Sequence, residues 1–387
     1  MPATPILIAG AGPVGLTAAL ALHHAGQAVR VMDARPAHSA HDDPRAVALS
    51  HGSRLILERF GVWHQITATP IAQIHVSQQG GFGQTRIEAD DYHLPALGYV
   101  ARLGALTSTL LHAVQQAGIA VDAGHTLTGT AHTADSVLAS IQHGGVTHQI
   151  ETGLLIAAEG RPPATAQRKD YGQTAIVTEV WSATSVGANS DTLSGHVSGS
   201  RSSRSAGAQA WERFTPEGPL ALLPLDNGYS VAWCMRDDHA RAALAQDDAA
   251  FLAALNAATA FARCRFTRIA ARAAFPLALV QAGTAHHPRE IALGNAAQTL
   301  HPVAGQGLNL GLRDAFELAE ALKPSLTMDA LTRYAGQRSR DRHATIALTD
   351  QYVSLFSNNS RRCASRAAPG WRCSTWCRHC AARWRGA

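Results

Sequence analysis

Short apolar segments alternate with amphipathic ones along the first part of the chain. Residues 5–9 and 29–32 have the apolar character of buried strands, and residues 16–24 between them have the spacing of a helix. A second amphipathic helix is expected over 106–117, followed by strands near 119–121 and through 126–150. Strands that are joined through helices in this order predict an α/β fold.

The middle of the chain is richer in strand patterns. Residues 71–77 alternate between apolar and polar side chains, and the glycine-containing segment 78–97 is typical of a hairpin. Further strands are expected over the segments 154–157, 170–180, 210–225 and 229–234. Two helices are also predicted: one opens at Asp43 to Ser50 and ends at Gly61, and one spans 241–263. Residues 183–209, rich in Ser and Gly, are expected to form a loop.

A glycine-rich turn joins the first strand to the first helix. It reads Gly10-Ala11-Gly12-Pro13-Val14-Gly15, and the next strand ends at Asp33. In a G-x-G-x-x-G turn the first glycine permits the tight bend, the second lets a pyrophosphate approach the backbone, and the third allows close packing of the helix. Asp33 can accept a hydrogen bond from a ribose hydroxyl. The pattern predicts dinucleotide binding, but by itself it does not separate FAD from NAD.

A second stretch, residues 294–314, follows the apolar strand 291–293. It passes through a loop with one Pro and several Gly residues into a helical pattern that contains Leu308, Leu312 and Phe316. A strand that runs through glycines into a helix start leaves backbone N–H groups unpaired beside the positive end of the helix dipole. Such a place suits an anion or a ring that becomes electron-rich. An ordinary strand-loop-helix connection is the alternative reading of this spacing.

The amino-acid sequence of this stretch is specific to one protein family. Gly-Asn-Ala-Ala-Gln-Thr-Leu-His-Pro, followed by Ala-Gly-Gln-Gly and Asn-Leu-Gly-Leu-Arg-Asp, resembles the second flavin-binding motif of single-component flavoprotein monooxygenases. It is most similar to the branch that hydroxylates polyprenylphenols on the way to ubiquinone, as are residues 170–180 and 210–225. The resemblance covers roughly residues 5–358.

The resemblance implies an α/β (α+β overall) fold like that of p-hydroxybenzoate hydroxylase. A Rossmann-type FAD-binding domain would be assembled from 1–70, 98–168 and 283–345, against a β-sheet substrate domain made of 71–97 and 169–282. The strands of the second domain would form the floor of an apolar pocket over the flavin. Residues 346–387 would hold a C-terminal helix and an altered tail.

The resemblance also implies roles for individual residues. Asn295, where the family more often has Asp, would bond the ribityl chain, because Asn keeps the side-chain oxygen acceptor. Pro302 would lie against the flavin with His301 nearby as a structural residue, and the amides of residues 307–309 would face the pyrimidine edge of the ring. Arg45 and Arg102 would approach the ring system. The expected cofactor-binding residues are Gly10, Gly12, Pro13, Gly15, Asp33, Arg45, Arg102, Glu159, Gly160, Gly294, Asn295, Pro302, Gly305, Gly307, Leu308 and Asn309.

A third motif departs from the family pattern. The strand that ends at Ala157-Ala158-Glu159-Gly160 resembles the family's Ala-Asp-Gly segment, which touches FAD and the nicotinamide nucleotide. Here Glu159 replaces the Asp, and Pro163 and Ala166 stand where Ser and Arg are expected. These changes put the nicotinamide-binding role of the segment in doubt.

The implied activity is that of an FAD-dependent monooxygenase. NAD(P)H would reduce the flavin, O₂ would form a flavin hydroperoxide, and one oxygen would pass to a phenol such as 2-polyprenyl-6-methoxyphenol in ubiquinone biosynthesis. Because the cofactor carries this chemistry, no catalytic triad is expected. Three alternatives stay open: a hydroxylase of another ring position or another phenol, an NAD-dependent dehydrogenase, and a catalytically silent flavin-binding member of a quinone-biosynthesis complex.

Composition adds two constraints. The chain of 387 residues is 46% hydrophobic and 16% charged, as expected for a globular enzyme with two domains. The formal net charge of +5 owes much to arginines in the last thirty residues, so no nucleic-acid partner is expected. No apolar run is long enough for a transmembrane segment and no signal peptide is visible, which favours a cytoplasmic protein, with peripheral contact at the inner membrane as a further expectation.

The last residues of the chain do not resemble the family. Cys373, Cys377, His379 and Cys380 have a ligand-like spacing for zinc. A frameshift near residue 360 is the preferred hypothesis, because GC-rich codons for this tail, read one nucleotide out of frame, encode an amphipathic Leu-rich segment like the family's C-terminal helix. The twenty histidines of the chain show no consistent metal spacing, so no metal site is predicted.

Overall fold

The computed structural model describes residues 6–36, 43–80, 84–183, 208–259, 264–283, 285–301 and 305–356. The chain forms two compact units. The first contains residues 1–67, 101–171 and 278–352, and the second contains 68–100, 172–277 and 353–387. The predicted mixed α/β fold class is confirmed, since both units are built around β-sheets with helices packed against them.

A largely parallel sheet forms the centre of the first unit. Its order is β18-β19-β11-β1-β2-β7, and the strands are β18 (Ala285–His287), β19 (Glu290–Ala292), β11 (Leu155–Ala157), β1 (Ile6–Ala9), β2 (Val29–Asp33) and β7 (Ala120–Ala123). Only β18 runs antiparallel to its neighbour β19. Ala157 on β11 is in register with Ala9 on β1 and with Ala292 on β19. The carboxyl ends of these strands therefore meet at one edge, which is where open α/β sheets bind ligands.

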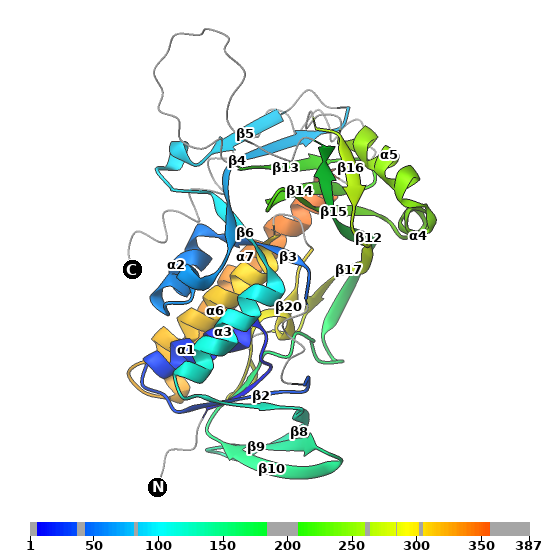
Figure 1. Cartoon of the computed structure of the whole chain (residues 1–387). Helices are drawn as coiled ribbons and strands as arrows, with labels where there is room; N and C mark the ends of the chain where they lie inside the picture. The colour runs from blue at the N-terminus through cyan, green and yellow to red at the C-terminus, as the bar shows by residue number, and fades with distance from the viewer. Residues whose placement is uncertain are drawn as a thin grey trace. The chain divides into compact units, whose positions relative to one another are not determined.

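Two further layers cover this sheet (Figure 1). The helices α1 (Pro13–His24), α3 (Leu103–Gln116) and α6 (Gln306–Leu322) lie together on one side. A three-stranded antiparallel sheet of β8 (Thr126–His132), β9 (Val137–His143) and β10 (Val146–Thr152) lies on the other. Its residues Val137, Ala139 and Ile141 form a hydrophobic core with Leu7, Met32 and other side chains of the parallel sheet. The unit is thus a three-layer structure.

The remaining elements of the first unit correct two predictions. They are β3 (Ala46–Ser50), α2 (His51–Arg59), η1 (Trp63–Gln65), η5 (Gly294–Ala296), β20 (Gln298–Thr299) and α7 (Met328–Phe356). The expectation that a helix opens over 43–50 is wrong: residues 46–50 form strand β3, and the helix begins only after Ser50, whose side chain caps it by accepting a hydrogen bond from the Ser53 N–H. The C-terminal helix, expected within 346–387, already begins at Met328.

The second unit is built on a sheet whose order is β12-β15-β14-β13-β4. Its strands are β4 (Ala68–Gln78), β12 (Gln167–Ser182, which begins in the first unit), β13 (Ala208–Phe214), β14 (Pro219–Leu225) and β15 (Gly228–Arg236), with β5 (Gln84–Glu88) paired to β4 and β16 (Phe266–Ile269) paired to β12. The 3₁₀ turn η2 (Asp90–Tyr92) follows β5, and β6 (Gly98–Arg102) and β17 (Ala273–Gln281) continue into the first unit. The hairpin predicted over 78–97 is displaced: its first strand is β4, which begins at Ala68, and only its second strand, β5, lies within the predicted range.

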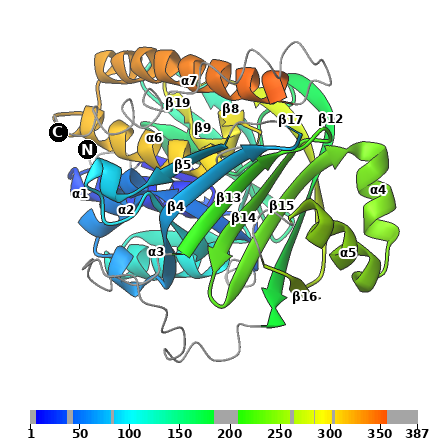
Figure 2. The same ribbon diagram turned by 90° about the horizontal axis from the view of Figure 1, so that it is seen from above.

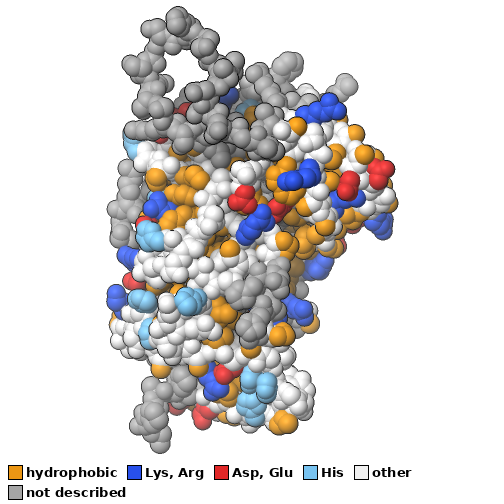
Figure 3. Space-filling model, viewed as in Figure 1, with side chains coloured by type: hydrophobic (Ala, Val, Ile, Leu, Met, Phe, Trp, Pro, Cys, Tyr) orange, Lys and Arg blue, Asp and Glu red, His pale blue; other side chains and the backbone are white. Residues whose placement is uncertain are grey.

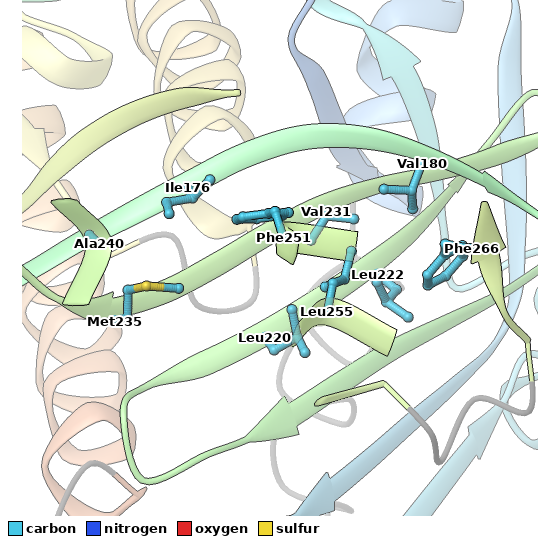
Figure 4. Packing of buried hydrophobic residues seen from close by; sticks show 10 residues of the cluster. All are labelled: Ile176, Val180, Leu220, Leu222, Val231, Met235, Ala240, Phe251, Leu255 and Phe266. Atoms are coloured by element: carbon cyan, nitrogen blue, oxygen red, sulfur yellow. The ribbon is translucent and has the colours of Figure 1, made fainter. Parts of the chain in front are cut away.

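Two helices cover one face of this sheet. Side chains from α4 (Asp237–Ala245) and α5 (Asp248–Ala258) pack onto Leu220, Leu222 and Val231 of the central strands (Figures 2 and 4). A single helix over 241–263 was expected, and that prediction is wrong. The chain breaks between Ala245 and Asp248 because the side chain of Asp247 accepts a hydrogen bond of 2.7 Å from the Ala250 N–H and so starts a new helix.

Several expected features lie outside the described residues. They are Pro302, most of the loop 183–209, Arg263 and the cysteine-rich tail with Cys373, Cys377, His379 and Cys380. Within the part of the chain that is described, no helix has both the length and the apolar character to cross a membrane.

Candidate functional site

The glycine-rich turn lies at the carboxyl end of β1. Gly10 has a φ of +115°, and a Cβ there would come within 2.4 Å of the Ala158 carbonyl oxygen, while a Cβ at Gly15 would come within 1.9 Å of the Gly10 oxygen. Both positions therefore require glycine. A Cβ at Gly12 would meet nothing within 4 Å among the described residues, so the backbone is open on that side. This is the approach that a pyrophosphate needs.

The first helix starts without a side-chain cap. Gly12 is the N-cap of α1 and Pro13 occupies its first turn. Proline is well suited to this position, because its missing N–H would have no helical partner there. The remaining N–H groups of the first turn lie at the positive end of a helix of 12 residues. These groups can donate hydrogen bonds to a phosphate.

Asp33, at the carboxyl end of β2, is fixed beside this turn. Its carboxylate accepts hydrogen bonds from the Ala11 N–H at 2.6 Å, from the Arg35 N–H at 2.8 Å and from Arg35 Nε at 2.9 Å. Burial opposes ionisation of this carboxyl, but the hydrogen bonds from Arg35 and Ala11 outweigh it and hold the pKa of Asp33 below its ordinary value. The group is thus an ionised acceptor of the kind that binds a ribose hydroxyl. Arg35 was not singled out from the sequence, although the Asp-x-Arg spacing is visible there.

Glu159 follows β11 at the same edge of the sheet. Burial raises the pKa of its carboxyl, and the negative charge of Asp33 raises it further, whereas Arg161 acts in the opposite direction. The mutual effect of Glu159 and Asp33 shows that these two predicted residues are brought near each other. Gly160 next to it has a φ of +75°, which suits the turn that leaves the strand.

The second predicted motif, residues 294–314, contacts the glycine-rich first motif at Val14. Gly294 follows β19 with a φ of +57°, and a Cβ there would come within 3.2 Å of Val14 Cγ2. On α6, a Cβ at Gly311 would come within 2.7 Å of the same atom and 3.1 Å of the Gly294 Cα. The two glycines therefore form a cradle for Val14, which holds the start of α1 against α6. Asn295 beside them is exposed, and the structure shows no hydrogen bond of its side chain to any described residue.

Like α1, the helix α6 begins without a side chain that caps its first N–H groups. Gly305 is its N-cap, has a φ of +59° and provides no side-chain cap. Gly307 and Leu308 follow in the first turn and are half-buried. A Cβ at Gly307 would meet nothing within 4 Å in the described structure. The N–H groups of Gly307 and Leu308 thus lie where they could donate to an electron-rich ring edge.

The side chain of Asn309 has a different role from the one predicted for its amide. Its Oδ1 accepts hydrogen bonds from the Ser50 N–H at 2.8 Å and from Ser53 Oγ at 2.7 Å, and its Nδ2 donates to the carbonyls of Ala48 and Gly305. These bonds tie the start of α6 to β3 and α2. The side chain of Asn309 therefore holds neighbouring backbone segments in place, and its oxygen and nitrogen atoms already have hydrogen-bond partners.

The segments that carry the two predicted arginines, Arg45 and Arg102, are joined to each other. The Arg45 guanidinium is held by Asp43, with Nε and Nη2 at 2.6–3.1 Å from its carboxylate oxygens. The Arg45 carbonyl accepts a hydrogen bond of 2.7 Å from the Leu103 N–H. Leu103 starts α3, and the preceding residue Arg102 is the N-cap of that helix. The segment that carries Arg45 is thus attached to the start of α3 on one side and, through Asn309, to the start of α6 on the other.

His301 is a buried structural group. Only 1% of its surface is exposed, and burial lowers the pKa of its imidazole to about 4. The ring lies edge-on to Tyr171 with centroids 5.2 Å apart. A neutral imidazole at neutral pH is a poor acid, so His301 is not suited to donate a proton. Pro302, which follows it, lies outside the described residues.

A network of ion pairs between α6 and α7 was not predicted from the sequence. Asp314 is fully buried and accepts from Arg338 Nε at 2.6 Å, and Arg338 also donates to Glu317 and Asp341 at 2.8 and 2.7 Å. Tyr334 donates its hydroxyl to the Asp314 carbonyl at 3.0 Å. These contacts lock α7 onto α6. No sequence signal connects Asp314 with Arg338, which lies 24 residues further along the chain.

Histidine side chains are spread over the face of the molecule that Figure 3 shows. The rings of His125 and His143 stack at 4.1 Å, and those of His132 and His287 stack at 3.7 Å. Nevertheless, the described residues contain no group of three or more His, Cys, Asp or Glu side chains with the geometry to hold a metal ion.

Comparison with known proteins agrees with this site. Residues 3–349 match the family model described as "FAD binding domain". The chain is 30% identical over 380 residues to 3-demethoxyubiquinol 3-hydroxylase of Escherichia coli, covering 92% of this chain and 90% of that protein. It is 26% identical over 423 residues to the mouse mitochondrial ubiquinone biosynthesis monooxygenase COQ6, covering 92% and 84%.

The fold is also shared with a solved structure. The p-nitrophenol 4-monooxygenase PnpA from Pseudomonas putida superposes with a TM-score of 0.74 over 99% of this chain and 98% of that one, at 16% sequence identity. At this identity the likeness shows the fold alone. Together with the family match, the findings show that the chain belongs to the family of FAD-dependent monooxygenases that includes the ubiquinone-biosynthesis hydroxylases.

Proposed function

We propose that this protein is an NAD(P)H-dependent hydroxylase of a polyprenylated phenol, with 2-polyprenyl-6-methoxyphenol as the substrate class. The observation that carries the proposal is the cradle at Val14, which joins the two flavin-type motifs at the carboxyl edge of one parallel sheet. The relatives named above act in ubiquinone biosynthesis, which supports a phenolic ubiquinone precursor as the substrate. The alternative of an NAD-dependent dehydrogenase is wrong, because the family is a flavin monooxygenase family.

The residues at the site fit FAD. The open side of Gly12 and the start of α1 would receive the pyrophosphate, and Asp33 would accept from a ribose hydroxyl. Asn295 would bond the ribityl chain, and the N–H groups at Gly307 and Leu308 would face the ring. When bound, the flavin supplies the redox chemistry with NAD(P)H and O₂. The chain's own residues bind the cofactor, orient it and keep water away from it.

A second function is favoured by one observation. The segment after Gly160 lacks the Ser and Arg of the family pattern, and burial together with Asp33 raises the pKa of Glu159. The longer side chain of Glu159 and the lost polar groups at Pro163 and Ala166 would weaken contacts with a nicotinamide nucleotide. A flavin-binding component of a quinone-biosynthesis complex, without its own turnover, is therefore the alternative.

A spectrum of the purified protein separates these functions. The hydroxylase is expected to be yellow, to be bleached by NADPH or NADH without oxygen, and to be bleached faster when a prenylphenol is present. In air it should form one hydroxylated product per NAD(P)H consumed. A yellow protein that neither nucleotide reduces would support the silent component. A protein that takes up no FAD would contradict both functions.

The substrate class also suggests where the protein works. A polyprenyl chain confines the phenol to a bilayer, so we propose that the protein is cytoplasmic and meets its substrate at the surface of the inner membrane. Sedimentation with vesicles of bacterial lipid, with and without the prenylphenol, measures this contact. Equal sedimentation of the protein with and without vesicles would contradict it.

A further inference from the structure

A carboxyl group stands on the face of the substrate-unit sheet that α4 and α5 do not cover. Side chains alternate across each strand, and Trp211 on β13 belongs to the face that packs against these helices. Glu212 therefore points to the opposite face. In register with it across the sheet are Ala221 on β14 and, beyond that, Ala232 on β15.

The side chains in register with Glu212 on the next two strands are small. Ala221 and Ala232 are half-buried, whereas Leu220, Leu222 and Val231 on the opposite face are fully buried. The small alanine side chains lie in a row beside the carboxyl. A planar ring placed on this row would have its edge next to Glu212, with apolar contacts beneath it.

Among the described residues, Glu212 has no partner that would explain its position. The structure shows no hydrogen bond or ion pair between its side chain and any described residue, although the side chain is only partly exposed. An unpaired carboxyl at a half-buried position costs free energy, so it needs a ligand or a proton to stabilise it. Burial raises the pKa of Glu212 to about 7, which makes the group a base of near-neutral strength.

The other titratable groups of this face do not replace it. Among the described residues with the same orientation are Cys234 on β15, Glu179 on β12 and Arg236 at the end of β15. Burial raises the pKa of the Cys234 thiol well above its ordinary value, and the charge of Glu212 adds to this effect, so the thiol stays protonated. Arg236 is paired with Asp238. Glu179 lies further along the sheet, in register with Ser230.

We propose that Glu212 is the base that accepts the proton of the substrate phenol during hydroxylation. This inference rests on the proposed function. The phenol O–H bond breaks, its electron pair enters the ring, and the activated ring carbon forms a bond to one oxygen atom derived from O₂ as the O–O bond breaks. The carboxylate of Glu212 takes the proton. The hydrogen on the attacked carbon is then lost as a proton when the ring regains aromaticity, and NAD(P)H supplies the two electrons that reduce the second oxygen atom to water.

The test compares Glu212→Gln with the wild-type protein, both loaded with FAD, on 2-geranyl-6-methoxyphenol. Glutamine keeps an oxygen that can accept the phenol hydrogen bond, but it is not a base. We expect KM to change little, and the rate of product formation to fall by roughly 100-fold, the usual contribution of a general base. NAD(P)H oxidation should continue, so that less product is formed per NAD(P)H consumed.

Two further measurements separate a base from a structural residue. The wild-type rate should rise with pH through about 7, as the carboxyl ionises, and Glu212→Gln should lose this rise. Glu212→Asp, which keeps a carboxylate, should recover part of the rate. Glu179→Gln, which alters a carboxyl on the same face, is the matched control and should behave like the wild-type protein.

The outcomes are distinct. A Glu212→Gln protein that holds FAD and hydroxylates the phenol at nearly the wild-type rate, or with the wild-type pH profile, would overturn the role of Glu212 alone. A wild-type protein that holds FAD but hydroxylates no prenylphenol would overturn the proposed function as well. If Glu212→Gln does not fold, the rate and pH profile of Glu212→Asp decide: a wild-type rate with an unchanged profile would overturn the proposal, and a slower rate with a shifted profile would support it.

Discussion

Gly311 on α6 lies directly against Val14 on α1. A Cβ at Gly311 would come within 2.7 Å of Val14 Cγ2, which is closer than real Cβ contacts allow. The first and second flavin-type motifs are separated by more than 270 residues in the sequence, and this contact is where they meet. The absence of a side chain at one residue thus decides how closely the two helix starts approach each other.

Gly311→Ala should therefore lower both stability and FAD affinity. Overpacking a tight contact costs about 1–3 kcal/mol, which exceeds the gain of up to about 1 kcal/mol from replacing glycine in a helix. Thermal unfolding of the FAD-free protein and fluorescence titration with FAD measure the two effects. The control is Gly336→Ala on α7, where a Cβ would meet nothing within 4 Å of the described structure and the helix should become slightly more stable.

Val14→Ala removes the atom that Gly311→Ala would strike. We expect the double variant to recover part of the stability that Gly311→Ala loses, although the Gly294 Cα at 3.1 Å still limits the space. Additive effects of the two substitutions in a double-mutant cycle would show that the contact does not join the motifs.

Asp33→Asn should weaken FAD binding by roughly 10- to 100-fold, since hydrogen bonds to a charged group contribute about 1.5–3 kcal/mol. The pKa of Asp33 is lowered, so the carboxylate remains ionised in the folded protein as the pH falls to its ordinary value of about 4. Wild-type FAD affinity should accordingly stay constant between about pH 7 and pH 5. Asp122→Asn is the control, because it removes an ion pair with Arg30 that lies away from the glycine-rich turn. A variant at Asp33 with unchanged FAD affinity would contradict the ribose role.

Asp314→Ala should be the most destabilising of these substitutions. It would remove the fully buried carboxylate that contacts both Arg338 and Arg342, which are 3% and 6% exposed, although Arg338 would keep its ion pairs with Glu317 and Asp341. Breaking a buried pair in this way costs about 3–5 kcal/mol. Glu317→Gln affects the same network at a side chain that is 41% exposed, and should cost about 1 kcal/mol or less. Denaturant unfolding of both variants checks this difference, and equal costs would contradict the argument.

Features set by neighbouring residues could be predicted from the sequence. The glycines of the first turn and the acid that ends the second strand follow local rules, and the structure places both as expected at the carboxyl edge of the sheet. The break between α4 and α5 also had a local signal, the cap at Asp247, which the composition of the segment concealed.

Features set by distant residues could not be predicted. Residues 46–50 form a strand, and the following helix start is held by Asn309, more than 250 residues away. The pairing of Asp314 with Arg338 depends on how α7 folds back onto α6. Glu212 looked like one polar position in an alternating strand, and only the sheet shows that it stands beside a row of alanines with no partner among the described residues.

Glu212→Gln should also change how stability depends on pH. Burial raises the pKa of this carboxyl from 4.5 to about 7 in the folded protein, so the fold favours the protonated form. The stability that this preference provides is fully present below about pH 4.5 and is lost as the pH rises through 7. At about 1.4 kcal/mol per pKa unit, the ionised group costs roughly 3 kcal/mol at pH 8, which glutamine avoids. The variant should therefore be more stable than the wild-type protein at pH 8 and similar to it at pH 4.5.

The control is Glu88→Gln, which replaces an exposed carboxyl on β5 and so gives the effect of a surface substitution for comparison. Chemical denaturation at both pH values measures this difference, and a stability gain that does not depend on pH would show that the Glu212 carboxyl is not held in an unfavourable environment.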